Sequence, residues 1–450
     1  MKQIFKTEMK RAMRGNGMAL SILIGILIGT AHVIQEIIPA YRANLTNFYN
    51  EFPILSPHSA VETWMAGSPS NAGLWRNFTE SEHDLTVRKG QRFRRMAVRA
   101  ELLKNIRQAE PYVPGEQPQN KVIKLNTNEN PYPPAPGVER VLREMDTDRF
   151  RLYPDPAAEE LTGCLAEYYG VDRDQVFVGV GSDDVLSMCF LTFFNSGKPV
   201  LFPDITYSFY KVWAGLYKIP YETPALDEQF RIVKEDYYRE NGGIIFPNPN
   251  APTAIYEELD FIEDILEHNR DSIVIVDEAY IDFAGRSALE LIDRYDNLIV
   301  TQTFSKARSM AGMRIGYAIS NPELIRCLND VKYSFNSYTM NQTAIACGVE
   351  AVRDKEYFEE HVRKIIETRE WAKEELHRLG FEFPDAKANF IFATHPQTDA
   401  GRLFEALKAN DIYVRHWDSE RIGQYLRITV GTREEMQVLF DFLTKYIKGE

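Results

Sequence analysis

The chain has 450 residues, of which 44% are hydrophobic and 26% charged, and its formal net charge is −13. This length predicts more than one folding unit, and the acidic excess argues against nucleic acid as a partner, because phosphates attract basic surfaces. The four cysteines show no Cys-x-x-Cys spacing and the eight histidines form no metal-binding pattern. We therefore predict neither a disulfide framework nor a metal site.

The first 92 residues differ in character from the rest of the chain. A basic segment at residues 1–14 precedes an apolar stretch at residues 17–38 whose first acid is Glu36. About 20 apolar residues can cross a bilayer, and a basic flank marks the cytoplasmic side. We predict a transmembrane helix at residues 17–38, with membrane contact there; a buried or interfacial helix is the alternative.

Between residues 122 and 320, short apolar runs alternate with helical patterns. Such runs are typical of strands buried on both faces, and their alternation with helices predicts an α/β fold with a mostly parallel sheet. After Asn321 a long charged helical stretch and further short strands predict a smaller α+β domain. The predicted parts are an extension at residues 1–92, an arm at 93–130, a large domain at 131–320 and a small domain at 321–450.

Two segments at the ends of predicted strands suggest a ligand site. The glycine-rich turn before Ser182 and Asp183 lets backbone N–H groups converge at a helix start, which suits an anion; a structural turn is the alternative. Asp277 ends a very apolar strand, where an unpaired acid is costly. A protonated pyridine nitrogen would stabilise that acid and keep the ring an electron sink, whereas a carboxylate capping the next turn is the plainer interpretation.

Two clusters of basic residues complete the pattern. Lys306 follows another buried strand, with Ser305 before it and Arg314 after it. A desolvated lysine can bind a carbonyl covalently, and Ser305 and Arg314 could share one phosphate; a surface lysine is the alternative. Arg415 and Arg427 end predicted strands of the small domain, where a guanidinium pair suits a phosphate or carboxylate, unless both are solvated strand-end charges.

The order of these motifs resembles one family. The set as a whole resembles the fold-type I, pyridoxal-phosphate-dependent class-II aminotransferases, specifically the histidinol-phosphate aminotransferases, from about Leu103 to the C-terminus. This resemblance implies a large domain with a seven-stranded sheet, pyridoxal 5′-phosphate as cofactor and a homodimer. It also implies amino transfer between histidinol phosphate or imidazole-acetol phosphate and glutamate or 2-oxoglutarate, in histidine biosynthesis. The motifs are residues 125–131, 152–155, 181–183, 206–207, 248–253, 277–280, 305–306, 314 and 426–431.

The resemblance also implies a role for each matching position. Lys306 is similar to the lysine that carries the cofactor and moves the proton. Asp277 corresponds to the partner of the pyridine nitrogen, Tyr280 to a donor to the ring's 3′-oxygen, and Tyr207 to the aromatic residue stacked on the ring. The implied phosphate-binding residues are Ser182, Asp183, Ser305 and Arg314. The implied substrate-binding residues are Asn130, Tyr153 from the neighbouring subunit, Arg415 and Arg427.

One motif departs from the family pattern. The usual Asn-Pro-Thr-Gly reads Ala251-Pro-Thr-Ala254 here. The family asparagine that bonds the 3′-oxygen commonly precedes the proline, where this chain has Ala251. We predict that Asn250, one residue upstream, takes its place in binding the cofactor.

Three other functions compete with this hypothesis. A threonine-phosphate decarboxylase and an aromatic amino-acid aminotransferase share most of the motifs. A non-catalytic, membrane-associated fusion protein is the alternative from a different class, and it draws on residues 17–38. We expect a cofactor-dependent enzyme to work in the cytoplasm. A single span at residues 17–38 would instead place the enzyme part outside it. A gene fusion or a mispredicted start would remove the conflict.

Overall fold

The computed structural model describes residues 99–449. The chain separates into two compact units between Arg107 and Gln108, and the described part of the first contains the short helix α6 (Ala100–Leu103). The helix predicted at residues 17–38 lies outside the described residues. Within residues 99–449 no helix is both long and apolar enough to cross a membrane.

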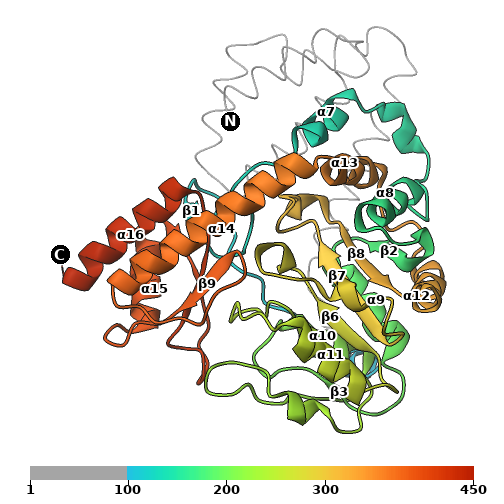
Figure 1. Cartoon of the computed structure of the whole chain (residues 1–450), viewed down its shortest axis with the longest axis horizontal. Helices are drawn as coiled ribbons and strands as arrows, with labels where there is room; N and C mark the ends of the chain where they lie inside the picture. Colours follow the sequence, from blue (N-terminus) through green and yellow to red (C-terminus); the bar gives the residue numbers. More distant parts are fainter. Residues whose placement is uncertain (1–98, 450) are drawn as a thin grey trace, which may run out of the picture. The chain divides into compact units, whose positions relative to one another are not determined.

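A seven-stranded sheet forms the centre of the second unit (Figure 1). Its strands run in the order β2-β8-β7-β6-β5-β3-β4, and all neighbours from β7 to β4 are parallel. Strand β8 is antiparallel to both β7 and β2. The predicted, mostly parallel seven-stranded sheet is therefore confirmed. The strands are β2 (Val176–Gly179), β3 (Val200–Leu201), β4 (Tyr221–Glu222), β5 (Ile244–Pro247), β6 (Val274–Asp277), β7 (Leu298–Thr303) and β8 (Gly316–Ser320).

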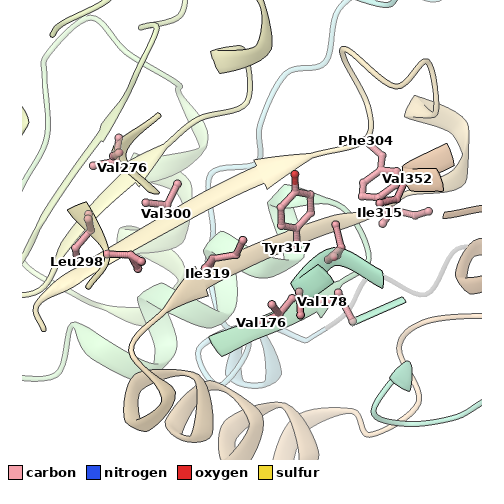
Figure 2. Close-up of a cluster of buried hydrophobic side chains, with 14 of the residues drawn as sticks. Val176, Val178, Val276, Leu298, Val300, Phe304, Ile315, Tyr317, Ile319 and Val352 are labelled. Atoms are coloured by element: carbon pink, nitrogen blue, oxygen red, sulfur yellow. The ribbon is translucent and has the colours of Figure 1, made fainter. Parts of the chain in front are cut away.

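The apolar runs of the sequence become strands because both faces of this sheet are covered. Figure 2 shows one face, where Val176 and Val178 of β2, Val300 of β7 and Ile319 of β8 belong to one buried cluster. The alternate residues, such as Ile299, point to the opposite face and join a second cluster. Successive side chains of a strand alternate between faces, so burial on both sides requires an uninterrupted apolar run.

Helices cover both faces. Helices α9, α10 and α12 pack over the face that contains Ile299, whereas α7, α8, α11 and α13 contribute to the face drawn in Figure 2. The α-helices of the second unit are α7 (Pro136–Glu144), α8 (Glu159–Tyr169), α9 (Ser182–Phe193), α10 (Phe209–Tyr217), α11 (Leu259–His268), α12 (Pro322–Phe335), α13 (Gln342–Arg353), α14 (Lys355–Arg378), α15 (Ala400–Ala409) and α16 (Arg433–Lys448). The 3₁₀ helices are η2 (Thr147–Arg151), η3 (Arg173–Gln175), η4 (Lys234–Tyr237), η5 (Ile281–Phe283), η6 (Ala288–Leu291) and η7 (Ala311–Met313).

The small domain is built on an antiparallel sheet of β11 (Arg415–His416), β12 (Leu426–Thr429) and β9 (Phe390–Ala393). Helices α14 and α16 lie next to each other beside it (Figure 1). The arm joins this domain, because β1 (Ile123–Lys124) pairs in parallel with β10 (Ile412–Tyr413).

The structure divides the two domains later in the chain than the predicted boundary at residue 321. Helices α12 and α13 follow that boundary, yet they pack on the large domain, α12 against α9 and α13 against α7 and α8. Buried residues of α13, such as Cys347, belong to the same cluster as the sheet. The small-domain core begins with α14, since Ile365 and Leu376 pack with β9 and β12. The composition changes at residue 321, but the packing partner changes only at α14.

Candidate functional site

Several of the predicted site residues lie at one edge of the large sheet. Asp277 is the last residue of β6, and it lies opposite Thr301 of the parallel strand β7. Lys306 follows three residues after β7 ends. The carboxyl ends of parallel strands share one edge of a sheet, where ligand sites form. Strand order alone thus brings the acid and the amine together.

A cavity of about 330 Å³ opens at this edge and extends to the small domain. Residues from the arm, from both domains and from the loops after β5 and β7 line it. Five of the predicted site residues are among them: Tyr207, Tyr280, Lys306, Arg415 and Arg427.

Lys306 is held from two sides. Its Nζ donates to the backbone oxygen of Thr127 at 3.2 Å and lies 5.6 Å from the centre of the Tyr280 ring. Asn130 donates to the backbone oxygens of Lys306 and Ala307 at 3.0 and 3.1 Å. The arm therefore fixes the backbone and the amine of this lysine.

Asp277 is a buried acid with a free hydrogen-bonding position. Tyr210 donates to its Oδ2 at 2.8 Å, whereas Oδ1 is buried and has no partner among the residues described. Burial raises the pKa of Asp277 to about 6, although the Tyr210 hydrogen bond opposes the shift. The Ala279 N–H and the Thr301 hydroxyl also stabilise the charged carboxylate and oppose the shift. A buried carboxylate that can still accept a hydrogen bond favours a cationic N–H donor.

Hydrogen-bond donors for an anion gather at the start of α9. Ser182 begins this helix after Gly181, whose φ is +86°, and the first turn of a helix has N–H groups without intrahelical partners. The Arg314 guanidinium donates to the carboxylate of Asp183 at 3.1 Å and to the hydroxyl of Ser305 at 3.5 Å. Asp183 also accepts from Tyr207 at 2.7 Å. The carboxylate of Asp183 can only accept hydrogen bonds. An anion at this position would therefore be bound by the backbone N–H of Asp183.

A second group of positive charge lies on the small-domain side of the cavity. Arg427 donates to the backbone oxygen of Asn126 at 2.8 Å, whereas its Nε is buried without a partner in the described chain. Burial and the charge of Arg415 lower the pKa of Arg427, while Tyr280 and Tyr112 oppose them. The Trp417 ring lies 5.2 Å from the Arg427 guanidinium and 5.4 Å from that of Arg415. The two guanidiniums thus lie against the same ring on one wall of the cavity.

The comparisons with known proteins agree with this geometry. The family model "Aminotransferase class I and II" matches residues 120–443. A histidinol-phosphate aminotransferase of Pseudomonas putida is 54% identical over 335 residues, 74% of this chain and 96% of the relative. One of Lactococcus lactis is 50% identical over 347 residues, 77% and 98% of the two chains.

The chain belongs to the histidinol-phosphate aminotransferase family.

Among solved structures, the histidinol-phosphate aminotransferase of Sinorhizobium meliloti in complex with pyridoxal-5′-phosphate has the same fold, with a TM-score of 0.66 and 23% identity over 72% of this chain and 90% of that one. The family fold predicted from the ordered motifs is thus confirmed, and the family depends on pyridoxal phosphate. The residues at the sheet edge fit that cofactor. The free oxygen of Asp277 can accept from a pyridinium, the start of α9 and Arg314 can hold a phosphate, and Lys306 offers an amine.

Three predicted family residues lie in other surroundings. Tyr153 is 81% exposed and stacks on Tyr338 at 4.7 Å, and it does not line the cavity of its own chain. Asn130 holds the backbone beside Lys306, as described above. Asn250 is buried, and its two amide N–H groups donate to Ile205 and Thr253. Its role as a donor to the cofactor stays a prediction.

Several residues at the site were not predicted individually. Tyr210, in the first turn of α10, donates to Asp277, and no sequence pattern marks it. Asn128, inside the recognised Asn-rich motif, donates to the Tyr280 hydroxyl at 2.9 Å. Tyr112 and Trp417 line the cavity from the arm and the small domain; no sequence pattern marks either.

Proposed function

We propose that this protein transfers an amino group from glutamate to imidazole-acetol phosphate, giving histidinol phosphate, and catalyses the reverse reaction. The convergence of Lys306, the unpaired oxygen of Asp277 and the donors around Ser182 and Arg314 at one sheet edge supports this best. The amine can react with the aldehyde of pyridoxal phosphate, the buried acid can bind its ring nitrogen, and the anion-binding donors can bind its phosphate.

Each side chain around the cofactor has a separate role in this proposal. When bound, pyridoxal phosphate would supply a covalent attachment point for the amino group and an electron sink. Lys306 provides the amine and moves a proton at the substrate Cα. Asp277 binds the ring nitrogen, Tyr207 stacks on the ring, and Tyr280 donates to the 3′-oxygen. Ser182, the backbone of Asp183, Ser305 and Arg314 bind the phosphate, and Asn250 binds the cofactor in place of the asparagine that usually precedes the proline.

The two arginines explain how one site accepts two substrates in turn. Histidinol phosphate carries a phosphate and no carboxylate, whereas glutamate carries carboxylates. The free Nε of Arg427, with Arg415 beside the same tryptophan, offers donors to either anion. Asn130 would assist in substrate binding from its place beside the backbone of Lys306. Glutamate loads the amino group first and imidazole-acetol phosphate then takes it, which is a ping-pong cycle.

The protein acts as a homodimer in this proposal. Exposed aromatic and aliphatic side chains gather around Tyr153 and Tyr338, a feature typical of interaction surfaces. They include Phe150, Leu152 and Phe335, which are 54%, 54% and 67% exposed. Tyr153 of the partner subunit would then contribute to the substrate phosphate site. We place the enzyme part in the cytoplasm, where phosphorylated intermediates are made; a mass of two chains in light scattering would support the dimer.

A direct assay tests the proposed reaction and separates it from its relatives. Purified protein with pyridoxal phosphate and glutamate should convert imidazole-acetol phosphate to histidinol phosphate. Release of carbon dioxide from threonine phosphate without amino transfer would indicate the decarboxylase instead. Efficient transfer to aromatic 2-oxo acids with none to imidazole-acetol phosphate would indicate an aromatic aminotransferase. No cofactor binding at all would favour a non-catalytic fusion protein.

A further inference from the structure

Asn128 is a buried residue of the arm, and each of its hydrogen-bonding groups has a partner. Its backbone N–H donates to Thr429 Oγ1 at 3.0 Å, and its backbone oxygen accepts from Asn389 at 3.1 Å. Its side chain accepts from the Thr429 hydroxyl at 3.1 Å and donates to the Tyr280 hydroxyl at 2.9 Å. The backbone φ is +56°, a region that asparagine tolerates better than most residues. The arm, the small domain and Tyr280 are thus connected through one side chain.

The hydrogen bonds of Thr429 fix the direction of the Asn128 amide. Because Thr429 Oγ1 already accepts the backbone N–H of Asn128, its own proton goes to the amide oxygen. The amide nitrogen therefore faces Tyr280. A phenol oxygen that accepts from an amide keeps its own proton for another acceptor, and linked hydrogen bonds strengthen one another.

The position directly before the proline of the Pro-Thr turn carries no amide, because it is Ala251. Ala251 has no polar side-chain atom, and both N–H groups of Asn250 are engaged by Ile205 and Thr253. Asn128, which comes from a different part of the chain, is the amide that reaches the hydroxyl of Tyr280.

We propose that Asn128 is a positioning residue that directs the Tyr280 proton toward the 3′-oxygen of the bound cofactor. This inference rests on the proposed function, in which Tyr280 donates to that oxygen. Asn128 itself contacts neither cofactor nor substrate.

The effect should be visible in the pH dependence of the cofactor's visible absorption band. That band changes when the proton shared by the Lys306 nitrogen and the 3′-oxygen is lost. Weaker donation by Tyr280 leaves this oxygen more basic, so the proton is held to higher pH. The other titratable groups facing Tyr280 are Lys306, Arg427, Tyr207 and Tyr210, and they stay unchanged in the variants below.

The test compares the band midpoint in cofactor-loaded wild type, Asn128→Gly, Tyr280→Phe and the double variant. Glycine accepts the positive φ without strain. Asn128→Gly should raise the midpoint by about 0.5–1 pH unit, the equivalent of one ordinary hydrogen bond. Tyr280→Phe should raise it further, and the double variant should match Tyr280→Phe. An unchanged midpoint in Asn128→Gly, or full addition of the two shifts, would overturn the proposal.

Two further variants guard against a purely structural effect. Asn269→Gly removes a buried asparagine before β6, at the opposite edge of the sheet, and should lower Tm without moving the midpoint. If Asn128→Gly does not fold, Thr429→Val should raise the midpoint and Thr429→Ser should restore it; equal midpoints in that pair would contradict the proposal. Wild type without any cofactor band would instead refute the proposed function.

Discussion

The two ends of the cavity are built differently. At the cofactor end, Asp277 and Ser305 are 3% and 7% exposed; Asp277 ends β6 and Ser305 follows β7, and both strands are buried along their whole length. At the substrate end, Arg415 lies on a strand of two residues and Arg427 has an unpaired nitrogen. The first end is built mainly on the large sheet, with the arm holding Lys306, whereas the second is built on the arm and the small domain alone. This difference suits a cofactor that stays and two substrates that alternate.

The largest effect should come from the cofactor end. Lys306→Ala removes the amine that acts covalently and as a proton carrier, so turnover should fall by roughly 10³-fold or more while the fold persists. Steady-state transfer from glutamate, together with circular dichroism, measures both. Substantial residual transamination in a folded variant would contradict the role of Lys306.

The pH dependence of cofactor binding should distinguish the cofactor end of the cavity from the substrate end. The raised pKa of Asp277, about 6, means that its carboxylate is neutral below this pH and charged above it. Because only the charged form pairs with a pyridinium, affinity should rise with pH through about 6, by up to about tenfold per unit. Asp277→Asn should flatten this dependence and weaken binding roughly 10- to 100-fold above it. Titration of apoprotein with pyridoxal phosphate at several pH values tests this.

A smaller effect is expected at the substrate end. Arg427→Lys keeps a charge but loses the planar donor set, so kcat/KM should fall about tenfold for both glutamate and histidinol phosphate. Cofactor affinity should be unchanged, since Arg427 lies on the small-domain wall. Loss of cofactor binding in this variant would show that the two ends are not independent.

The smallest effect concerns the N-terminal extension. Deleting residues 1–90 should leave kcat and KM unchanged, because the described residues that line the cavity all lie after Gln108. Activity assays of the truncated and full-length chains provide the comparison. A folded but inactive truncated protein would show that the extension contributes to the site.

The sequence was most informative where burial constrains it. Continuous apolar runs followed by single polar residues predicted the sheet, and with it the meeting of Asp277 and Lys306, because parallel strands end at one edge. The sequence did not predict that α12 and α13 pack on the large domain. An amphipathic pattern shows that one helix face is buried, but not which domain covers that face. The Asn128–Tyr280 contact joins residues 152 positions apart. Such a hydrogen bond depends on the tertiary fold and leaves no local pattern.

The central claim is that Lys306 carries the cofactor that Asp277 faces. Borohydride reduction of the cofactor-loaded protein, followed by peptide mass spectrometry, tests it most directly. We predict a single pyridoxyl label on Lys306, formed in wild type and much reduced in Asp277→Asn at subsaturating cofactor. A label on another lysine, or no label in protein that binds the cofactor, would contradict the account.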